Sequence, residues 1–495
     1  MLMRVIKYLL PAIAALLSLS SCDDKPSKGK FSIAIDSHTV CTFDAQSVDI
    51  SYTLDSSNDT ASAPAITATT DAEWLDISRT SRGSIVVDVE QNEGELRTAT
   101  ITLSGEGIAP CTVEFSQIAA PAELSNHTLI YYFFGTSLSR YFDYNIEDAS
   151  TAIGEGILGN NNRVVLFRQT GLSSGYYAEL CYDPIHHNAI VRRIKEITLP
   201  ATTTSSDIAA VIDFAANIAP AKRYGMVLAG HGQGWVTCAA LNKEQEVIPF
   251  SLDHGIWTPR PGAEVTRAFG ERNVQVNIPT LAEGITAADA TMEYLLFDAC
   301  FMSNIEALYD LRNAAHYIIA SPCEIMGRGF PYHRTLPYLF ANDGTSSDLE
   351  GAAESYYIYY RDEYTGASRC GSVAVIDCTE LEPLADATRT LLTTATSEYD
   401  ASLLQTYEGH HDHIFYDFGE LCAVVATDRA ALDAFKRQME LTVVAKYTLP
   451  TFYSAYGYDT YPINEEVYSG VTTSEPSIVY TDEWRETSWY SRIWE

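Results

Sequence analysis

The sequence is poor in basic residues: 32 Lys and Arg stand against 65 Asp and Glu, which gives a net charge of −33. Such a chain repels a phosphate backbone, so nucleic acid is not an expected partner. Beyond the N-terminus, no run approaches the roughly 18 apolar residues that a membrane-spanning helix needs. The sequence also lacks internal repeats and low-complexity tracts. Its 495 residues, 46% of them hydrophobic, suffice for more than one globular domain.

The ten cysteines include no Cys-x-x-Cys pair, so a structural zinc site is not expected. Apart from Cys22, nine cysteines remain, and an odd number leaves at least one thiol unpaired even where disulfides form. We expect Cys300 to be a free thiol, whereas Cys41 and Cys111 are candidates for a disulfide. The histidines at 410, 411 and 413 favour a solvated loop over a metal site, and we predict no metal.

The N-terminus has the order of a processing signal. Arg4 and Lys7 precede an apolar stretch from Leu9 to Leu19 that is too short for a stable span. The sequence Leu19-Ser20-Ser21-Cys22 then resembles a bacterial lipobox, which implies a signal peptide over 1–21 and a lipid on Cys22. Residues 22–30 are a predicted tether. The expected location is the bacterial cell envelope, with a membrane contact through the lipid; an ordinary secretory signal is the alternative.

Residues 31–118 contain short runs in which apolar and polar residues alternate, such as 84–89 and 98–103. The turn sequences Asn92-Glu93-Gly94 and Gly105-Glu106-Gly107 separate them. This pattern predicts an all-β, immunoglobulin-like antiparallel sandwich.

The positions around Trp74, the Asn92 turn, Arg97 and the closing run 113–117 resemble the BACON module of exported bacterial proteins. That resemblance implies either a contact with glycans or a spacer. The sequence shows no exposed aromatic stripe, which favours the spacer.

Beyond a predicted linker at 119–124, the pattern changes. From 125 to 495, continuous apolar runs of four to eight residues alternate with longer amphipathic stretches. The runs lie at 129–134, 164–167, 226–229, 294–297, 317–320 and 373–376. This alternation predicts an α/β domain with a parallel sheet that helices cover on both faces.

Two of these runs lead into reactive side chains. One ends at His231-Gly232 and the other at Asp298-Ala299-Cys300. Because working residues of open α/β sheets follow the carboxyl ends of strands, two neighbouring parallel strands would bring the imidazole and the thiol together. Such a pair can form a thioester, with His231 protonating the leaving amine.

The flanking residues fit this chemistry. Gly232 leaves room for a substrate backbone and offers its N–H to a developing oxyanion. A helix predicted from Met302 to Asn313 would favour the Cys300 thiolate through its N-terminus. Asp298 is either a participant in the site or the N-cap of that helix.

The His-Gly pair and the Asp-Ala-Cys-x-Met motif, each after a strand, resemble the clostripain-like cysteine peptidases, which share the fold of caspases, gingipains and legumain. The resemblance covers most of 125–495, including 144–147, 267–270, 320–330 and 416–421. It implies a caspase-like three-layer sandwich with a mainly parallel sheet, a peptide or protein substrate, and a His231/Cys300 dyad. Gly232, Asp298 and Ala299 are then the near-site residues.

The resemblance also bears on specificity. Members that cut after Arg or Lys generally carry an acid at the base of the specificity pocket, and we assign that position to Arg328. A guanidinium there would pair with a carboxylate, so we expect acidic or neutral residues before the cut. In the alternative, Arg328 faces solvent and Glu324 or another acid serves the pocket. Relatives often cleave themselves between the two catalytic residues, where Lys243, Arg260, Arg267 and Arg272 lie, but nothing marks one bond.

The resemblance implies no required cofactor. Calcium supports some members, and the sequence has no EF-hand type of acidic loop that would demand it. Two other functions compete with an endopeptidase: a catalytically idle surface-adhesion protein that binds glycans, and a thiol-dependent peptide ligase. Retention of both His231 and Cys300 argues against the idle protein, whereas a ligase would use the same dyad.

Overall fold

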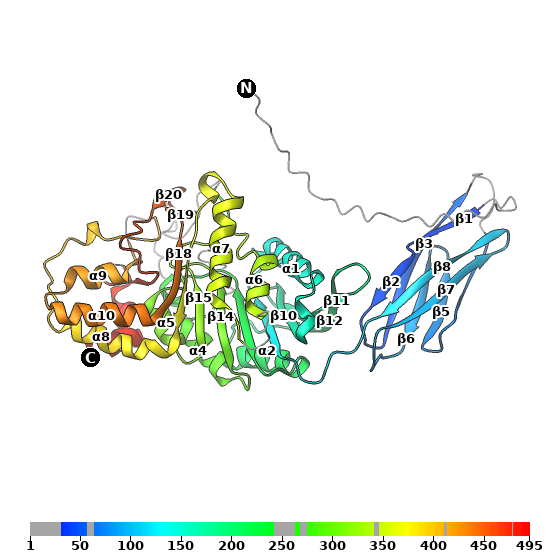
Figure 1. Ribbon diagram of the computed structural model, residues 1–495, viewed down its shortest axis with the longest axis horizontal. Coiled ribbons are helices and arrows are strands. Elements are labelled where there is room, and N and C mark those ends of the chain that lie inside the picture. The colour runs from blue at the N-terminus through cyan, green and yellow to red at the C-terminus, as the bar shows by residue number, and fades with distance from the viewer. Residues whose placement is uncertain are drawn as a thin grey trace, which may run out of the picture. The chain divides into compact units, whose positions relative to one another are not determined.

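The computed structural model describes residues 31–56, 64–241, 263–267, 275–340, 346–409, 413–477 and 479–495. The chain divides between Pro121 and Ala122 into two compact units, and the stretch Asp183–Ile190 groups with the first (Figure 1). In the described part of the chain, no helix is both long and apolar enough to cross a membrane.

The first unit is a β-sandwich of two four-stranded sheets, with strand orders β1-β3-β6-β5 and β2-β8-β7-β4. Alternation builds its core: in β7 the side chains of Ala99, Ile101 and Leu103 point inward and are buried. The pairings are antiparallel, as predicted, except that β2 runs parallel to β8. The strands are β1 Phe31–Ile35, β2 His38–Cys41, β3 Gln46–Ser56, β4 Ile66–Thr70, β5 Leu75–Ser81, β6 Ser84–Val89, β7 Arg97–Gly105 and β8 Ile108–Gln117.

Several residues of the BACON-like motif meet at one end of this sandwich. The Arg97 guanidinium donates to the Gln117 side chain and stacks 4.3 Å from the centroid of the Trp74 ring. The Gln117 amide donates in turn to the carbonyl oxygens of Thr42 and Glu90. Trp74 therefore packs against the core under an arginine instead of presenting a free aromatic face.

The disulfide between Cys41 and Cys111 that was considered from the sequence is not formed in this structure. The sandwich is held by its apolar core, in which Ile85, Ile101 and Phe115 are fully buried.

The second unit is built on a nine-stranded sheet of order β12-β11-β10-β9-β13-β14-β15-β16-β18. Each of the six predicted apolar runs lies in one of its strands. The five central strands, from β10 to β15 in that order, are parallel, whereas β11, β16 and β18 pair antiparallel. The sheet is therefore mixed. The strands are β9 His127–Phe133, β10 Asn162–Gly171, β11 Ser174–Asp183, β12 Asn188–Thr198, β13 Tyr224–Ala229, β14 Met292–Asp298, β15 Ala315–Ala320, β16 Ser372–Asp377 and β18 Val443–Thr448.

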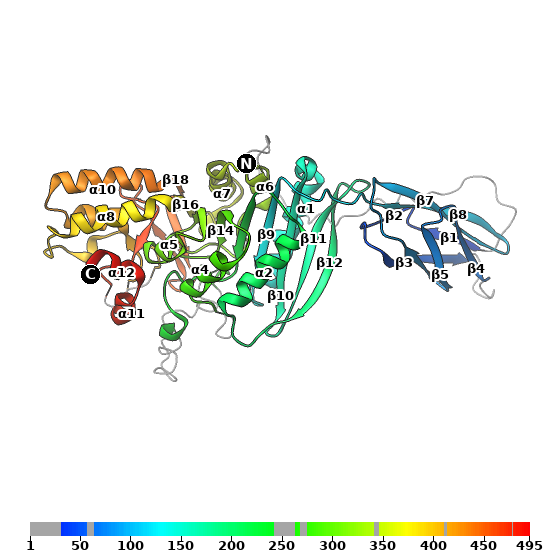
Figure 2. The ribbon, with the colours of Figure 1, turned by 90° about the horizontal axis from the view of Figure 1, so that it is seen from below.

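Helices cover both faces of this sheet. Helices α1, α6 and α7 pack on one face, and α2, α4 and α5 pack on the other (Figure 2). The helices are α1 Ser139–Gly154, α2 Ser205–Ile218, α4 Ile278–Ala287, α5 Ile305–Leu311, α6 Tyr332–Phe340, α7 Leu349–Glu363, α8 Leu381–Leu392, α9 Phe418–Val425, α10 Arg429–Thr442, α11 Thr481–Arg485 and α12 Ser488–Trp494. The short strand pairs are β17 Tyr416–Asp417 with β21 Thr472–Thr473, and β19 Thr451–Ser454 with β20 Asp459–Pro462.

Candidate active site

The loops that follow β13 and β14 meet at one edge of the sheet. Ala229 pairs with Asp298 in the parallel ladder, so His231 and Cys300 each stand two residues beyond a paired position. The predicted pair of adjoining parallel strands is thus observed. A Cβ atom at Gly232 would come within 2.1 Å of the Cys300 carbonyl oxygen, so the two loops can approach this closely only with glycine at 232.

Cys300 is fully buried, and the backbone of Ile325 holds its thiol. Its Sγ accepts a hydrogen bond from the Ile325 N–H at 2.9 Å and lies 3.6 Å from the Ile325 carbonyl oxygen. Burial raises the pKa of the Cys300 thiol well above its ordinary value, and the nearby Glu324 carboxylate raises it further. In this state the sulfur is a neutral thiol and a poor nucleophile.

His231 is only partly buried and has a hydroxyl partner. Its Nε2 lies 2.8 Å from the Oγ of Ser137, which belongs to the loop between β9 and α1. Imidazole and thiol thus come from adjacent loops, and each is hydrogen-bonded to another part of the chain.

The helix after Cys300 begins later than the sequence pattern indicates. Phe301 has a left-handed backbone with φ of 60°, and α5 starts at Ile305. Its N-cap is Asn304, whose side chain accepts from the Ala307 N–H at 3.2 Å. The predicted helix from Met302 was therefore wrong at its start, and Asp298 is not its cap.

Two backbone donors converge on one carbonyl oxygen beside Cys300. The N–H groups of Gly232 and Cys300 donate to the carbonyl oxygen of Arg267 at 2.8 Å and 3.3 Å. A pair of fixed N–H groups of this kind stabilises the negative oxygen of a tetrahedral intermediate. In this structure the Arg267 carbonyl oxygen occupies the position between these two N–H groups.

The segment around Arg267 lies as an added strand along residues 325–327. The Arg267 N–H donates to the Ile325 carbonyl at 2.8 Å, and the Gly327 N–H donates to the Val265 carbonyl at 2.6 Å. Thr266 pairs antiparallel with Met326. An extended peptide that binds a sheet edge makes this same set of main-chain bonds.

The Arg267 side chain fills a closed, polar pocket, and both it and the Asp298 side chain are fully buried. Its guanidinium forms an ion pair with the Asp298 carboxylate at 3.0 Å and donates to Asn145 Oδ1 at 2.8 Å. It also donates to the carbonyl oxygens of Asp298 and Gly327. We name this enclosure, formed by Asn145, Asp298 and 327–329, the arginine pocket.

Asp298 is fixed from several sides. Tyr332 Oη donates to it at 2.7 Å and the Phe330 N–H at 3.3 Å. Burial raises the pKa of Asp298, and the Arg267 guanidinium opposes that rise. A Cβ atom at Gly329, where φ is +70°, would lie 2.4 Å from both the Arg267 Nη2 and an Asp298 oxygen. The arginine pocket therefore requires glycine at this position.

The comparisons with known proteins agree with this geometry. Residues 137–468 match the Clostripain family. The chain belongs to the clostripain family. As a member it is a cysteine peptidase, and no curated protein matches it.

Three solved structures illustrate the likeness. A secreted cysteine protease of Bacteroides thetaiotaomicron, iotapain, is 30% identical, with 75% of this chain and 100% of that chain covered and a TM-score of 0.64. Another secreted protease of the same organism, in complex with an irreversible peptide inhibitor, is 25% identical, with coverages of 74% and 99% and a TM-score of 0.61. An inactive zymogen from Parabacteroides distasonis is 25% identical, with coverages of 76% and 100% and a TM-score of 0.61.

The two residues assigned to specificity take different places within this clostripain-family site. The Arg328 guanidinium pairs with Asp148 at 2.8 Å and stacks on Tyr144, while only its carbonyl oxygen reaches the Arg267 side chain. Glu324 is buried and accepts a hydrogen bond from the Thr266 hydroxyl at 2.6 Å. Glu324 thus touches the residue before Arg267, not Arg267 itself.

Sequence reasoning missed four contributors to the site: Ser137, Asn145, Gly329 and Tyr332. Asn145 and Gly329 stand inside stretches that carried the family resemblance, so a signal existed for them, whereas Ser137 and Tyr332 had none. Ala299 lies in the loop after β14, where it is buried and lines a cavity. Of the histidine cluster, 410–412 lie outside the described residues, and His413 hydrogen-bonds Glu408.

Proposed function

We propose that this protein is a cysteine endopeptidase that uses Cys300 as nucleophile and His231 as acid and base, and that it cuts after arginine. The observation that carries this proposal is the Arg267 carbonyl oxygen held by the N–H groups of Gly232 and Cys300. A substrate carbonyl in the same place would be polarised by the same two donors.

The reaction follows from the atoms present. His231 takes the proton of the Cys300 thiol as the sulfur forms a bond to the carbonyl carbon, and the carbonyl electrons move to the oxygen between the two N–H groups. The C–N bond then breaks as His231 gives that proton to the leaving amine, which leaves a thioester. His231 next takes a proton from water, whose oxygen attacks the thioester; the C–S bond breaks, His231 returns the proton to the sulfur, and the carboxylate and the Cys300 thiol are released.

The preference for arginine reverses the expectation drawn from Arg328. That guanidinium is neutralised by Asp148 and lies outside the arginine pocket. The acid that faces the bound side chain is Asp298, which makes a buried ion pair supported by Tyr332. A planar guanidinium can donate hydrogen bonds to several of these fixed acceptors at once, which a lysine ammonium does less well.

The intact chain holds its own Arg267 as a substrate would lie, which supports self-cleavage at the Arg267–Ala268 bond. The reaction requires the Cys300 side chain to rotate from Ile325 toward the Arg267 carbonyl carbon. Until the bond is cut, the segment 265–267 excludes other peptides from the same contacts. The uncut protein is therefore expected to be a weak peptidase.

Self-cleavage tests this proposal. On incubation, the full chain should split into two fragments, the second beginning at Ala268. Cys300→Ala and His231→Ala should abolish the cut, and Arg267→Lys should slow it about ten-fold, because an ammonium cannot reproduce the fork of hydrogen bonds. N-terminal sequencing of the fragments checks the bond. Arg272→Lys is the matched control and should change nothing; a cut that persists in Cys300→Ala would refute the dyad.

We propose further that Cys22 carries a lipid and that the β-sandwich is a spacer between that anchor and the peptidase. The partly buried Trp74, which packs against the core beneath Arg97, supports the spacer, and in the described part of 31–118 Leu96 is the large hydrophobic side chain that stands exposed. Incorporation of a fatty-acid label that disappears in Cys22→Ala tests the anchor; a label that remains contradicts it.

A further inference from the structure

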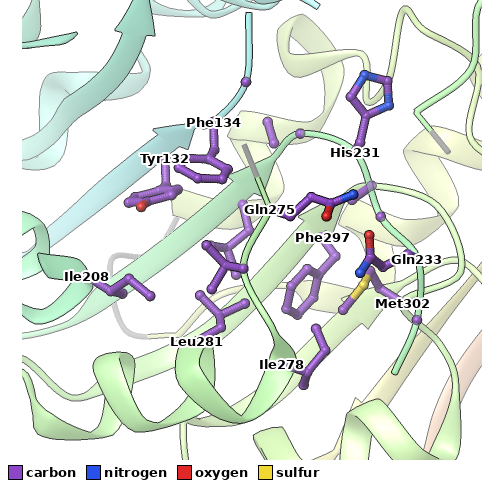
Figure 3. A pocket seen from close by; sticks show the side chains of 18 residues that line it. Tyr132, Phe134, Ile208, His231, Gln233, Gln275, Ile278, Leu281, Phe297 and Met302 are labelled. Carbon is purple, nitrogen blue, oxygen red and sulfur yellow. The ribbon is translucent and has the colours of Figure 1, made fainter. Parts of the chain in front are cut away.

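A second hollow lies at the same edge of the sheet, across from the arginine pocket. It has a volume of about 90 Å³. Helices α2 and α4 contribute Ile208, Ile278 and Leu281 to its wall, and the strands contribute Tyr132 and Phe297 (Figure 3). We name this hollow, defined by these five side chains and the loop 230–234, the apolar cavity.

The apolar cavity and the arginine pocket share the residues that flank the reacting atoms. Gly232 gives its N–H to the Arg267 carbonyl and also lines the cavity. Ala299 and Met302, on either side of the Cys300 position, line it as well, and His231 stands on its rim (Figure 3). A cavity wall thus lies within one residue of the bond that would be cut.

The two hollows lie on opposite faces of the sheet. The arginine pocket takes Asn145 from α1, and its Asp298 accepts a hydrogen bond from Tyr332 of α6; both helices cover one face. The apolar cavity takes Ile208 from α2 and Leu281 from α4, which cover the other. Gly232 both holds the carbonyl oxygen of the residue in the arginine pocket and lines the apolar cavity. We therefore expect the residues that follow a bound arginine to pass the mouth of the apolar cavity.

We propose that the apolar cavity binds an aliphatic side chain from one of the first two residues after the cleaved bond. This inference rests on the proposed function and extends it to the leaving half of the substrate. The apolar lining matches hydrocarbon, and the volume of about 90 Å³ is smaller than the ~150 Å³ of a cavity that holds benzene. We therefore expect leucine or valine to be preferred over phenylalanine.

One polar group in the cavity wall points to a peptide as the occupant. The Gln275 Oε1 atom is buried and has no hydrogen-bond partner among the residues that the structure describes. Gln275 lies between His231 and the apolar floor (Figure 3). A backbone N–H of the leaving peptide would satisfy this acceptor while its side chain fills the apolar part.

Peptide reporters test the proposal directly. The self-cut form of the full chain, prepared by incubation or by limited trypsin digestion, would be given peptides that share Val-Thr-Arg and differ only after the arginine. Leu, Val, Ala, Ser, Asp and Phe would be placed in turn at the first and at the second following position. We expect kcat/KM for Leu or Val at one of them to exceed that for Ser or Asp at least ten-fold, with Phe below Leu.

Reshaping the cavity should move this preference. Leu281→Phe, which fills the cavity, should erase the advantage of Leu over Ala, and Leu281→Ala, which enlarges it, should raise Phe above Leu. Leu384→Ala on α8 removes another buried leucine, one that does not line the cavity, and should leave every ratio unchanged. Ratios between reporters within one variant cancel any difference in the folded fraction.

The outcomes of these assays distinguish a failure of this inference from a failure of the proposed function. Reporters cut after arginine at the same rate whatever follows would overturn this inference and leave the proposed function standing. A leaving-side preference that survives in both Leu281 variants would also overturn it. If no reporter is cut at all, the proposed function falls and takes this inference with it.

Discussion

The arginine pocket and the apolar cavity lie at one edge of one sheet and differ in almost every physical respect. The first is closed, charged and filled by the chain itself; the second is largely apolar, with Gln275 as a polar group in its wall. Charged hydrogen bonds to a guanidinium have strict geometry, so the first can reject wrong residues strongly. An apolar hollow discriminates by size and only weakly. The two halves of a substrate are thus expected to be recognised with very different stringency.

The largest effect on substrate recognition is expected from removing the negative charge of the arginine pocket. Asp298→Asn leaves the guanidinium of a bound arginine without its buried partner, a loss of about 4 kcal/mol or roughly 1,000-fold in kcat/KM. Rates on Arg reporters measure this. Asp148→Asn, which frees Arg328 instead, is the control and should change the rate less than three-fold. Equal losses in the two variants would mean that Arg328 governs the pocket after all.

The pH dependence of folding stability is a further difference between the arginine pocket and the apolar cavity, because buried carboxyl groups lie at or beside the arginine pocket. Burial raises the pKa of Glu324 to about 7 from an ordinary value of 4.5. Its protonated form is favoured in the folded state, so the stabilisation is complete below pH ~4.5 and is lost as the pH rises through about 7. The loss is at most roughly 3 kcal/mol.

Glu324→Gln should remove that loss, so its unfolding midpoint should fall less between pH 5 and pH 8 than that of the parent. Urea unfolding of both chains in a Cys300→Ala background measures the difference. Asp417 and Glu475 also have raised pKa values and remain in both proteins, so only the difference counts. A parallel decline in the two proteins would contradict the assignment to Glu324.

A single added methyl group tests how closely the arginine pocket fits. Gly329→Ala places a carbon against the guanidinium and the carboxylate, and we expect a loss of about 2 kcal/mol, or roughly 30-fold in kcat/KM on Arg reporters. Gly366 also has a positive φ, +64°, but open space around its Cβ position. Gly366→Ala should therefore cost some stability and leave kcat/KM unchanged. A similar loss of activity in both would attribute the effect to backbone strain alone.

Much of the sheet in the second unit could be predicted from the sequence, because a continuous apolar run indicates a strand that is buried on both faces. All six runs in the second unit are strands, and those ending at His231 and Asp298 are parallel neighbours. Strand direction was harder: the run 373–376 is equally apolar, yet β16 is antiparallel to β15. Burial on both faces looks the same whichever way a strand runs.

The contents of the site were beyond sequence reasoning for a different reason. Arg267 is one of several basic residues between His231 and Cys300, and nothing in the neighbouring sequence marks it as buried. Its place depends on bonds to Ile325, Asp298 and Asn145, which come from three distant parts of the chain. Arg328 was expected to select acidic or neutral residues because its charge looks free in the sequence. In the structure its guanidinium pairs with Asp148, which is 180 residues away.

The way Ile325 holds Cys300 bears on how the protein survives before use. Oxidants and alkylating agents attack the exposed thiolate, and a buried thiol of raised pKa offers them very little of it. The same hydrogen bonds that are expected to keep the thiol from acting as a nucleophile should therefore also protect the sulfur from irreversible oxidation. If the protein is exported into an oxidising environment, its Cys300 thiol should therefore still be reduced when it arrives.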